Sequence, residues 1–140
     1  VFPNLAKLNF FNATNLLNGT TTNFKLGLVT SSWTPNNATN EVWGDVSANE
    51  ISAGNGYTAG GKTLTNVTVN QSGTTAYFDC DNVTWDPAAF TARGALIYNS
   101  SKGNKSVAVL DFGSDKTTTS TFTITMPANT ASAALIRSSI

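Results

Sequence analysis

The sequence predicts a mainly β protein, an antiparallel β-sandwich or small barrel of about eight strands with a short N-terminal helix. Short runs alternate small polar residues with apolar ones, as in Lys62–Val69 and Thr119–Thr125. Turn residues separate such runs at intervals of roughly ten residues, a spacing typical of sandwiches and barrels. This alternation suits sheets that are hydrated on one face or pressed against a neighbour.

The first segment differs from the rest of the chain. Apolar residues within Asn4–Asn18 approximate helical spacing, Pro3 stands just before them and Gly19 follows as a stop signal. The length of 140 residues fits a single domain. We therefore expect residues 1–23 to form a helical or extended segment and residues 24–140 to form the β core.

From Phe24 onward the apolar period is two. The predicted strands are Phe24–Thr30, Lys62–Val69, Thr74–Asp79, Asn82–Trp85, Ala92–Asn99, Ser106–Phe112, Thr118–Thr125 and Ala133–Arg137. The predicted turns after the second strand are Gln71–Gly73, Asp86–Pro87, Ser100–Asn104, Gly113–Lys116 and Pro127–Thr130. The segment Ser31–Gly61 is long for a loop, and loops of this length usually make contacts or carry function.

The charge of the chain argues against two classes of partner. Eight basic and eight acidic residues give a net charge of zero, and charged residues make up 11% of the chain. Such a surface offers no basic field for nucleic acid and no polybasic patch for a membrane, and no apolar run approaches the length of a membrane span. A near-neutral surface promotes association, so we expect a subunit of an assembly that contacts copies of itself.

Residues that usually carry chemistry are scarce. The chain has no histidine and one cysteine, Cys80, which excludes histidine-based triads, imidazole metal sites and an internal disulfide. Asp79, Asp81 and Asp86 could act as a carboxylate pair or as calcium ligands, although turn capping is the more ordinary role and the glutamate that ends a calcium loop is missing. We expect no catalytic residue, no bound metal, no cofactor and a core position for Cys80.

Three aromatic residues stand along the long segment: Trp33, Trp43 and Tyr57. They are candidate contacts for a partner subunit or a ligand, since aromatic rings stack on sugars and anchor interfaces. They could equally pack the long segment onto its own sheet. Packing within the chain or against another subunit is the favoured interpretation.

An ordered series of motifs resembles a known family. The motifs are Leu26–Pro35, Gly56–Leu64, Asp81–Trp85, Thr91–Tyr98, Asp111–Gly113 and Phe122–Pro127. In sequence and order they resemble a widespread family of small structural proteins from the virions of tailed bacteriophages. The resemblance runs from about Leu26 to Ile136.

The resemblance implies a non-enzymatic virion protein. The expected function is that of a capsid cement or decoration protein, which bridges capsomers on the outer capsid surface and has the major capsid protein as a partner. A tail or head–tail component is the alternative within the same class. A carbohydrate-binding or receptor-binding β-sandwich that uses Trp33, Trp43 and Tyr57 is the alternative from another class, and an enzyme that uses the three aspartates is a further one.

Overall fold

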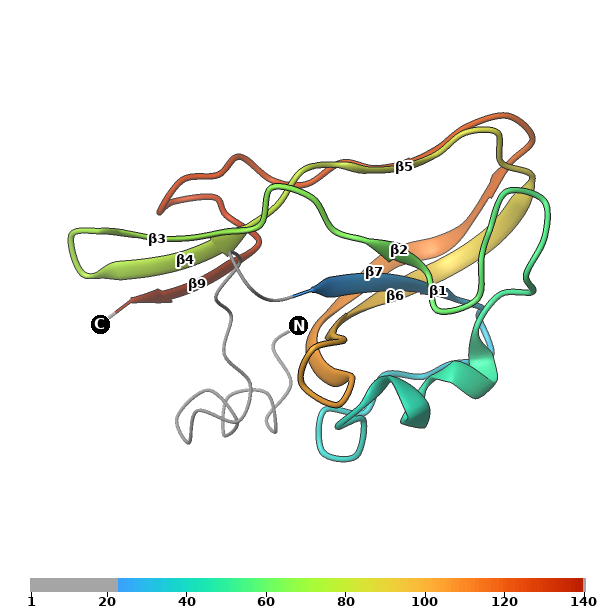
Figure 1. The fold of residues 1–140 in the computed structure, drawn as a ribbon, viewed down its shortest axis with the longest axis horizontal. Coiled ribbons are helices and arrows are strands. Elements are labelled where there is room, and N and C mark those ends of the chain that lie inside the picture. Colours follow the sequence, from blue (N-terminus) through green and yellow to red (C-terminus); the bar gives the residue numbers. More distant parts are fainter. Residues whose placement is uncertain (1–22, 140) are drawn as a thin grey trace.

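The chain folds into antiparallel β-sheets, as the alternating pattern predicts. In the computed structural model the described part of the chain is residues 23–139 (Figure 1). The strands are β1 (Phe24–Val29), β2 (Lys62–Thr63), β3 (Thr68–Ser72), β4 (Thr75–Asp79), β5 (Val83–Trp85), β6 (Phe90–Asn99), β7 (Lys105–Thr118), β8 (Phe122–Ile124) and β9 (Ile136–Ser139). Two short 3-10 helices, η1 (Trp43–Asp45) and η2 (Ser47–Asn49), lie between β1 and β2. The helix predicted at Asn4–Asn18 lies outside the described residues.

The strands form three sheets, and these do not close into a barrel. The main sheet has the order β2-β1-β6-β7, the arm has the order β3-β4-β9, and the ribbon consists of β5 and β8. All the pairings are antiparallel. Figure 1 shows the ribbon running above the main sheet and the arm extending to one side of it. No helix among residues 23–139 is long and apolar enough to cross a membrane.

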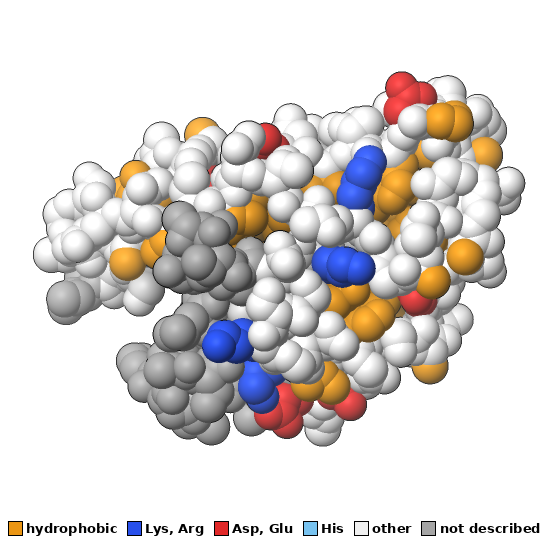
Figure 2. Space-filling model, in the orientation of Figure 1, with side chains coloured by type: hydrophobic (Ala, Val, Ile, Leu, Met, Phe, Trp, Pro, Cys, Tyr) orange, Lys and Arg blue, Asp and Glu red, His pale blue; other side chains and the backbone are white. Residues whose placement is uncertain are grey.

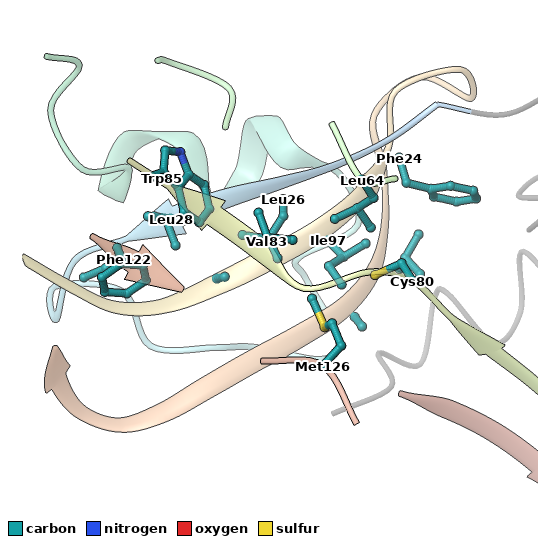
Figure 3. Close-up of a cluster of buried hydrophobic side chains, with 14 of the residues drawn as sticks. Phe24, Leu26, Leu28, Leu64, Cys80, Val83, Trp85, Ile97, Phe122 and Met126 are labelled. Carbon is teal, nitrogen blue, oxygen red and sulfur yellow. The ribbon is translucent and has the colours of Figure 1, made fainter. Parts of the chain in front are cut away.

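One core lies between the main sheet and the ribbon. Alternate residues of β1, which are Phe24, Leu26 and Leu28, belong to the same buried cluster as Trp85 of β5 and Phe122 of β8. Figure 3 shows these side chains spread along the space between the strands, with Phe24 at the opposite end from Trp85 and Phe122. Edge-to-face contacts join the rings, with centroids 6.0 Å apart between Trp85 and Phe122. Burial of such large apolar groups is the main favourable term in folding, so this cluster holds the two sheets together.

A second core covers the opposite face of the main sheet. It contains Val29 and Leu96, the alternate residues of β1 and β6, together with Trp33, Trp43 and Val46 of the long segment. Because side chains point to opposite faces in turn along a strand, burial of both sets leaves β1 almost completely buried. The long segment is therefore a layer that packs on the sheet.

The predicted turn at Gly113–Lys116 is wrong, because β7 continues through it. The ladder places Asp111 opposite Gly94 and next places Lys116 opposite Ala92, so the intervening residues bulge out of the pairing. Gly113 has a φ of 79°, a conformation that favours glycine. Glycine with neighbouring polar residues signals a bulge as well as a turn, and only pairing with the long β6 decided between them.

The predicted strand Lys62–Val69 is divided between two sheets. β2 ends at Thr63, and the amide of Leu64 donates to the carbonyl oxygen of Phe24 at 2.8 Å as the Leu64 side chain enters the core. Asn66 then takes a positive φ of 49°, which asparagine tolerates better than most residues. The chain thereby leaves the main sheet and enters the arm at β3.

Candidate functional site

The three aromatic residues singled out in the sequence lie on opposite faces of the main sheet. Trp33 and Trp43 belong to the second core, whereas Tyr57 belongs to the first. Their exposed fractions are 9%, 8% and 3%. Three side chains divided between two cores do not make a shared platform for a sugar, so the carbohydrate-binding alternative loses the basis that the sequence provided for it.

Trp43 is fitted to a gap in the main sheet. Its ring stacks on Tyr98 with centroids 5.0 Å apart and an interplanar angle of 11°. The same ring lies over Gly27 of β1, where a Cβ atom would come within 2.2 Å of the Trp43 Cη2 atom. The Trp43 amide donates to the carbonyl oxygen of Asn104 at 2.9 Å, which ties the segment to the start of β7.

Tyr57 organises a partly buried polar network that the sequence did not reveal. Its hydroxyl donates to Glu50 Oε1 at 2.7 Å and accepts the amide of Leu28 at 3.0 Å. Glu50 Oε1 also accepts the amide of Gly60 at 2.6 Å, and the Tyr98 hydroxyl donates to the Gly60 carbonyl oxygen at 2.5 Å. Burial raises the pKa of Tyr57 well above its usual range, and the bond to Glu50 adds to the rise. The network fixes the end of the long segment against β1, and nothing in the local pattern around Glu50 indicated it.

A small cavity lies beside Trp33. It has a volume of about 320 Å³, and its lining includes Thr30, Trp33 and the ion pair between Arg93 and Asp111. The bond from Arg93 lowers the pKa of Asp111, and the amide of Gly113 lowers it further. Trp33 Nε1 is buried and has no hydrogen-bond partner among residues 23–139. Because that atom is shielded from solvent, a ligand in the cavity would not reach it without a rearrangement.

The three aspartates lie in different environments. Asp79 is fully buried and its Oδ1 accepts the amide of Cys80 at 2.8 Å, while its Oδ2 has no partner in the described part of the chain. Asp81 is exposed, and its Oδ2 accepts Asn66 Nδ2 at 2.5 Å, while Asp86 is exposed before the cis bond to Pro87. Residues 23–139 contain no group of three or more acidic, cysteine or histidine side chains placed to hold a metal ion.

Cys80 is a buried core residue, as its sequence setting predicts. It is 9% exposed and belongs to the first core. Burial raises the pKa of its thiol to about 12, and the charges of Asp79 and Asp81 add to the rise. A thiol that stays protonated is a poor nucleophile, so this position suits packing.

A groove between β7 and β8 opens toward the first core. These strands follow one another in the chain but do not pair, since each lies at the edge of a different sheet. The groove has a volume of about 510 Å³, and its apolar lining residues are Phe112, Phe122 and Ile124. Threonines make up most of the remaining lining, and Lys116 is its only charged residue.

Comparisons with family models, with curated proteins and with solved structures found no match. The functional argument therefore depends on the residues of this chain.

Proposed function

We propose that the protein is a non-enzymatic structural component of a tailed-bacteriophage virion, and specifically a β-sandwich cement or decoration protein. In this role it lies on the outer capsid surface and bridges neighbouring capsomers through contacts with the major capsid protein. The sequence motifs that resemble phage virion proteins are the basis for the class of protein. Within that class of protein, the groove between β7 and β8 is the observation that favours a cement or decoration role.

The groove has the chemistry of a surface that is covered in an assembly. Its apolar floor continues into the first core, while Thr121, Thr123 and Thr125 of its rim are exposed and uncharged. Covering these threonines costs little, because hydroxyl groups readily find new hydrogen-bond partners, and Lys116 is the one charged residue of the lining. Figure 2 shows the same sparse distribution of charge on the face it displays. A contact of this kind is modest singly and becomes large when repeated over a shell.

The residues that carry the family resemblance also make physical sense. Trp85 and Tyr98 are buried anchors of the two cores, and Gly61 has a φ of 80° where a Cβ atom would meet the carbonyl oxygen of Leu26 at 1.9 Å. The motifs therefore coincide with positions that the fold requires.

Purified virions and particles that lack the protein test this proposal. The protein should be present in large stoichiometric amounts, and particles without it should fail at lower temperature or under osmotic shock. Added protein should restore resistance, Thr125→Glu should prevent rescue by placing a charge at the groove, and Thr39→Glu on an exposed loop should not. If each virion contains no more copies than one ring of subunits around the tail axis can hold, the tail or head–tail role is favoured. Particles equally resistant without the protein would contradict the cement role.

A further inference from the structure

The arm formed by β3, β4 and β9 has an edge that no described strand covers. β3 pairs with β4 on one side, and it is the outermost strand of its sheet on the other. In an antiparallel ladder every second residue directs its N–H and C=O groups away from the partner strand, so β3 presents along its outer edge backbone groups that no strand among residues 23–139 pairs with. Figure 1 shows the arm extending away from the main sheet.

The surface of β3 is exposed and uncharged. Val69 is 51% exposed and is the one large hydrophobic side chain classed as exposed among the described residues, while Asn70, Gln71 and Ser72 are exposed as well. Thr68 at the start of the strand is held by Asn129, whose Nδ2 donates to its Oγ1 at 2.9 Å. The accessible edge therefore begins at Val69 and carries no charged residue.

The other edge strands carry features that hinder pairing with another chain. β2 has two residues and contains Lys62, β7 is interrupted by the bulge at Gly113, and β9 carries the exposed Arg137. β5 and β8 have three residues each. Charges, bulges and short length are the devices by which proteins protect sheet edges. β3 has none of them, with five residues, regular pairing to β4 and no proline or charge.

We propose that β3 is a self-association edge at which a second copy of this chain adds its own β3, antiparallel, about a two-fold axis through Asn70. The axis places Asn70 opposite the partner's Asn70 and Val69 opposite the partner's Gln71. The two-fold axis doubles the three-stranded arm. The two arms then form one continuous six-stranded sheet of order β9-β4-β3-β3-β4-β9. The same patch meets itself in a two-fold contact, so self-complementarity is required of it.

The absence of charged residues from β3 favours a second copy of the chain as the partner. Like charges that face one another across paired strands are destabilising, and a charged strand that meets its own copy risks such a contact in many registers. Thr68–Ser72 contains no charge, so its self-pairing meets no repulsion. A single pair of five-residue strands buries much less than the roughly 1,200 Å² of a stable complex. The contact is therefore weak in dilute solution and forms where copies are concentrated, as on a shell.

Disulfide trapping tests the pairing without any virion. Residues directly opposite across antiparallel strands have Cβ atoms about 5 Å apart, so Asn70→Cys should cross-link between two copies about tenfold faster than a site outside the edge. Ala76→Cys is the matched control, because Ala76 is exposed on the same arm but belongs to the central strand β4. Cys80 stays in place in both variants, since it is buried.

Sedimentation velocity over a range of concentrations supplies the second measurement. The parent protein should shift toward dimer as its concentration rises, and Val69→Lys should abolish the shift while retaining the fold by circular dichroism. Equal cross-linking of Asn70→Cys and Ala76→Cys, or association unchanged by Val69→Lys, would overturn the proposal. Association with a strand of another protein alone would also overturn it. These outcomes do not depend on the virion role, so failure of either proposal is recognisable separately.

Discussion

Replacement of Gly27 by alanine tests whether the long segment is a packed layer of the fold. A Cβ atom at Gly27 would lie 2.2 Å from Trp43 Cη2, about 1.5 Å closer than an ordinary carbon–carbon contact. The Trp43 ring has little room to retreat, because it stacks on Tyr98 at 5.0 Å. Overpacking of this kind costs about 1–3 kcal/mol, so Gly27→Ala should lower the free energy of unfolding by that amount.

The cost should depend on the tryptophan ring. In a Trp43→Leu background the shorter side chain no longer reaches Gly27, and alanine is favoured over glycine within a strand by about 0.5–1 kcal/mol. Gly27→Ala should then be neutral or slightly stabilising, which corresponds to a coupling energy of about 1–4 kcal/mol in a double-mutant cycle. Urea unfolding followed by far-ultraviolet circular dichroism measures all four proteins, since the transition midpoint of each is read from its own folded and unfolded baselines.

Gly44→Ala is the matched control for this cycle. A Cβ atom at Gly44 would meet Val42 Cγ2 at 3.8 Å, an ordinary contact, so the change should stay within about 0.5 kcal/mol. If Gly27→Ala cost the same with tryptophan or leucine at position 43, the ring would not be the source of the strain. The view of the long segment as a docked layer would then be refuted.

Three further predictions concern buried hydroxyl and thiol groups. Tyr57→Phe removes the hydroxyl that joins the Leu28 amide to Glu50, and urea unfolding should show a loss of about 1–3 kcal/mol because the buried Leu28 amide loses its acceptor, while Glu50 keeps the Gly60 amide. Cys80 should resist iodoacetamide in the folded protein and react in urea, because burial raises its pKa to about 12. Burial also raises the pKa of Tyr98 from 10.0 to about 12, so the folded state keeps a proton that the unfolded state releases. The contribution of Tyr98 to the free energy of unfolding is complete below pH 10 and should decline between pH 10 and 12. Urea unfolding at a series of pH values would show this decline.

Each of these predictions has a control. Tyr77 is a half-exposed tyrosine of β4, and Tyr77→Phe should change the stability by no more than about 0.5 kcal/mol. An equal effect of Tyr57→Phe and Tyr77→Phe would show that the network contributes nothing. Rapid alkylation of Cys80 in the folded protein would contradict its burial. Tyr98→Phe should reduce the alkaline loss, and an unchanged loss would assign it to other groups.

The sequence pattern located strands where a segment forms a single strand with turn signals on both sides. The predicted strands match β1, β4, β5 and β6 within a few residues, because runs of apolar and β-branched residues bounded by turn signals are typical of strands. The pattern was misleading where the same residues are typical of two structures, such as a turn and a bulge. Gly113 marks a bulge in place of the predicted turn, and Lys62–Val69 divides between two sheets because Leu64 enters the core.

The composition of the chain by itself determined the class of fold and the scarcity of charge and of chemistry-bearing side chains, since alternation, charge and residue types are local properties. Only the tertiary structure decided where the aromatic residues lie, on which face of the main sheet each one packs, and which strand edges no other strand among residues 23–139 covers. Those features depend on contacts between residues far apart in the chain, such as Trp43 against Gly27 and Tyr57 against Leu28. A local pattern shows that a side chain will be buried, but the partner that buries it is set by how the sheets come together.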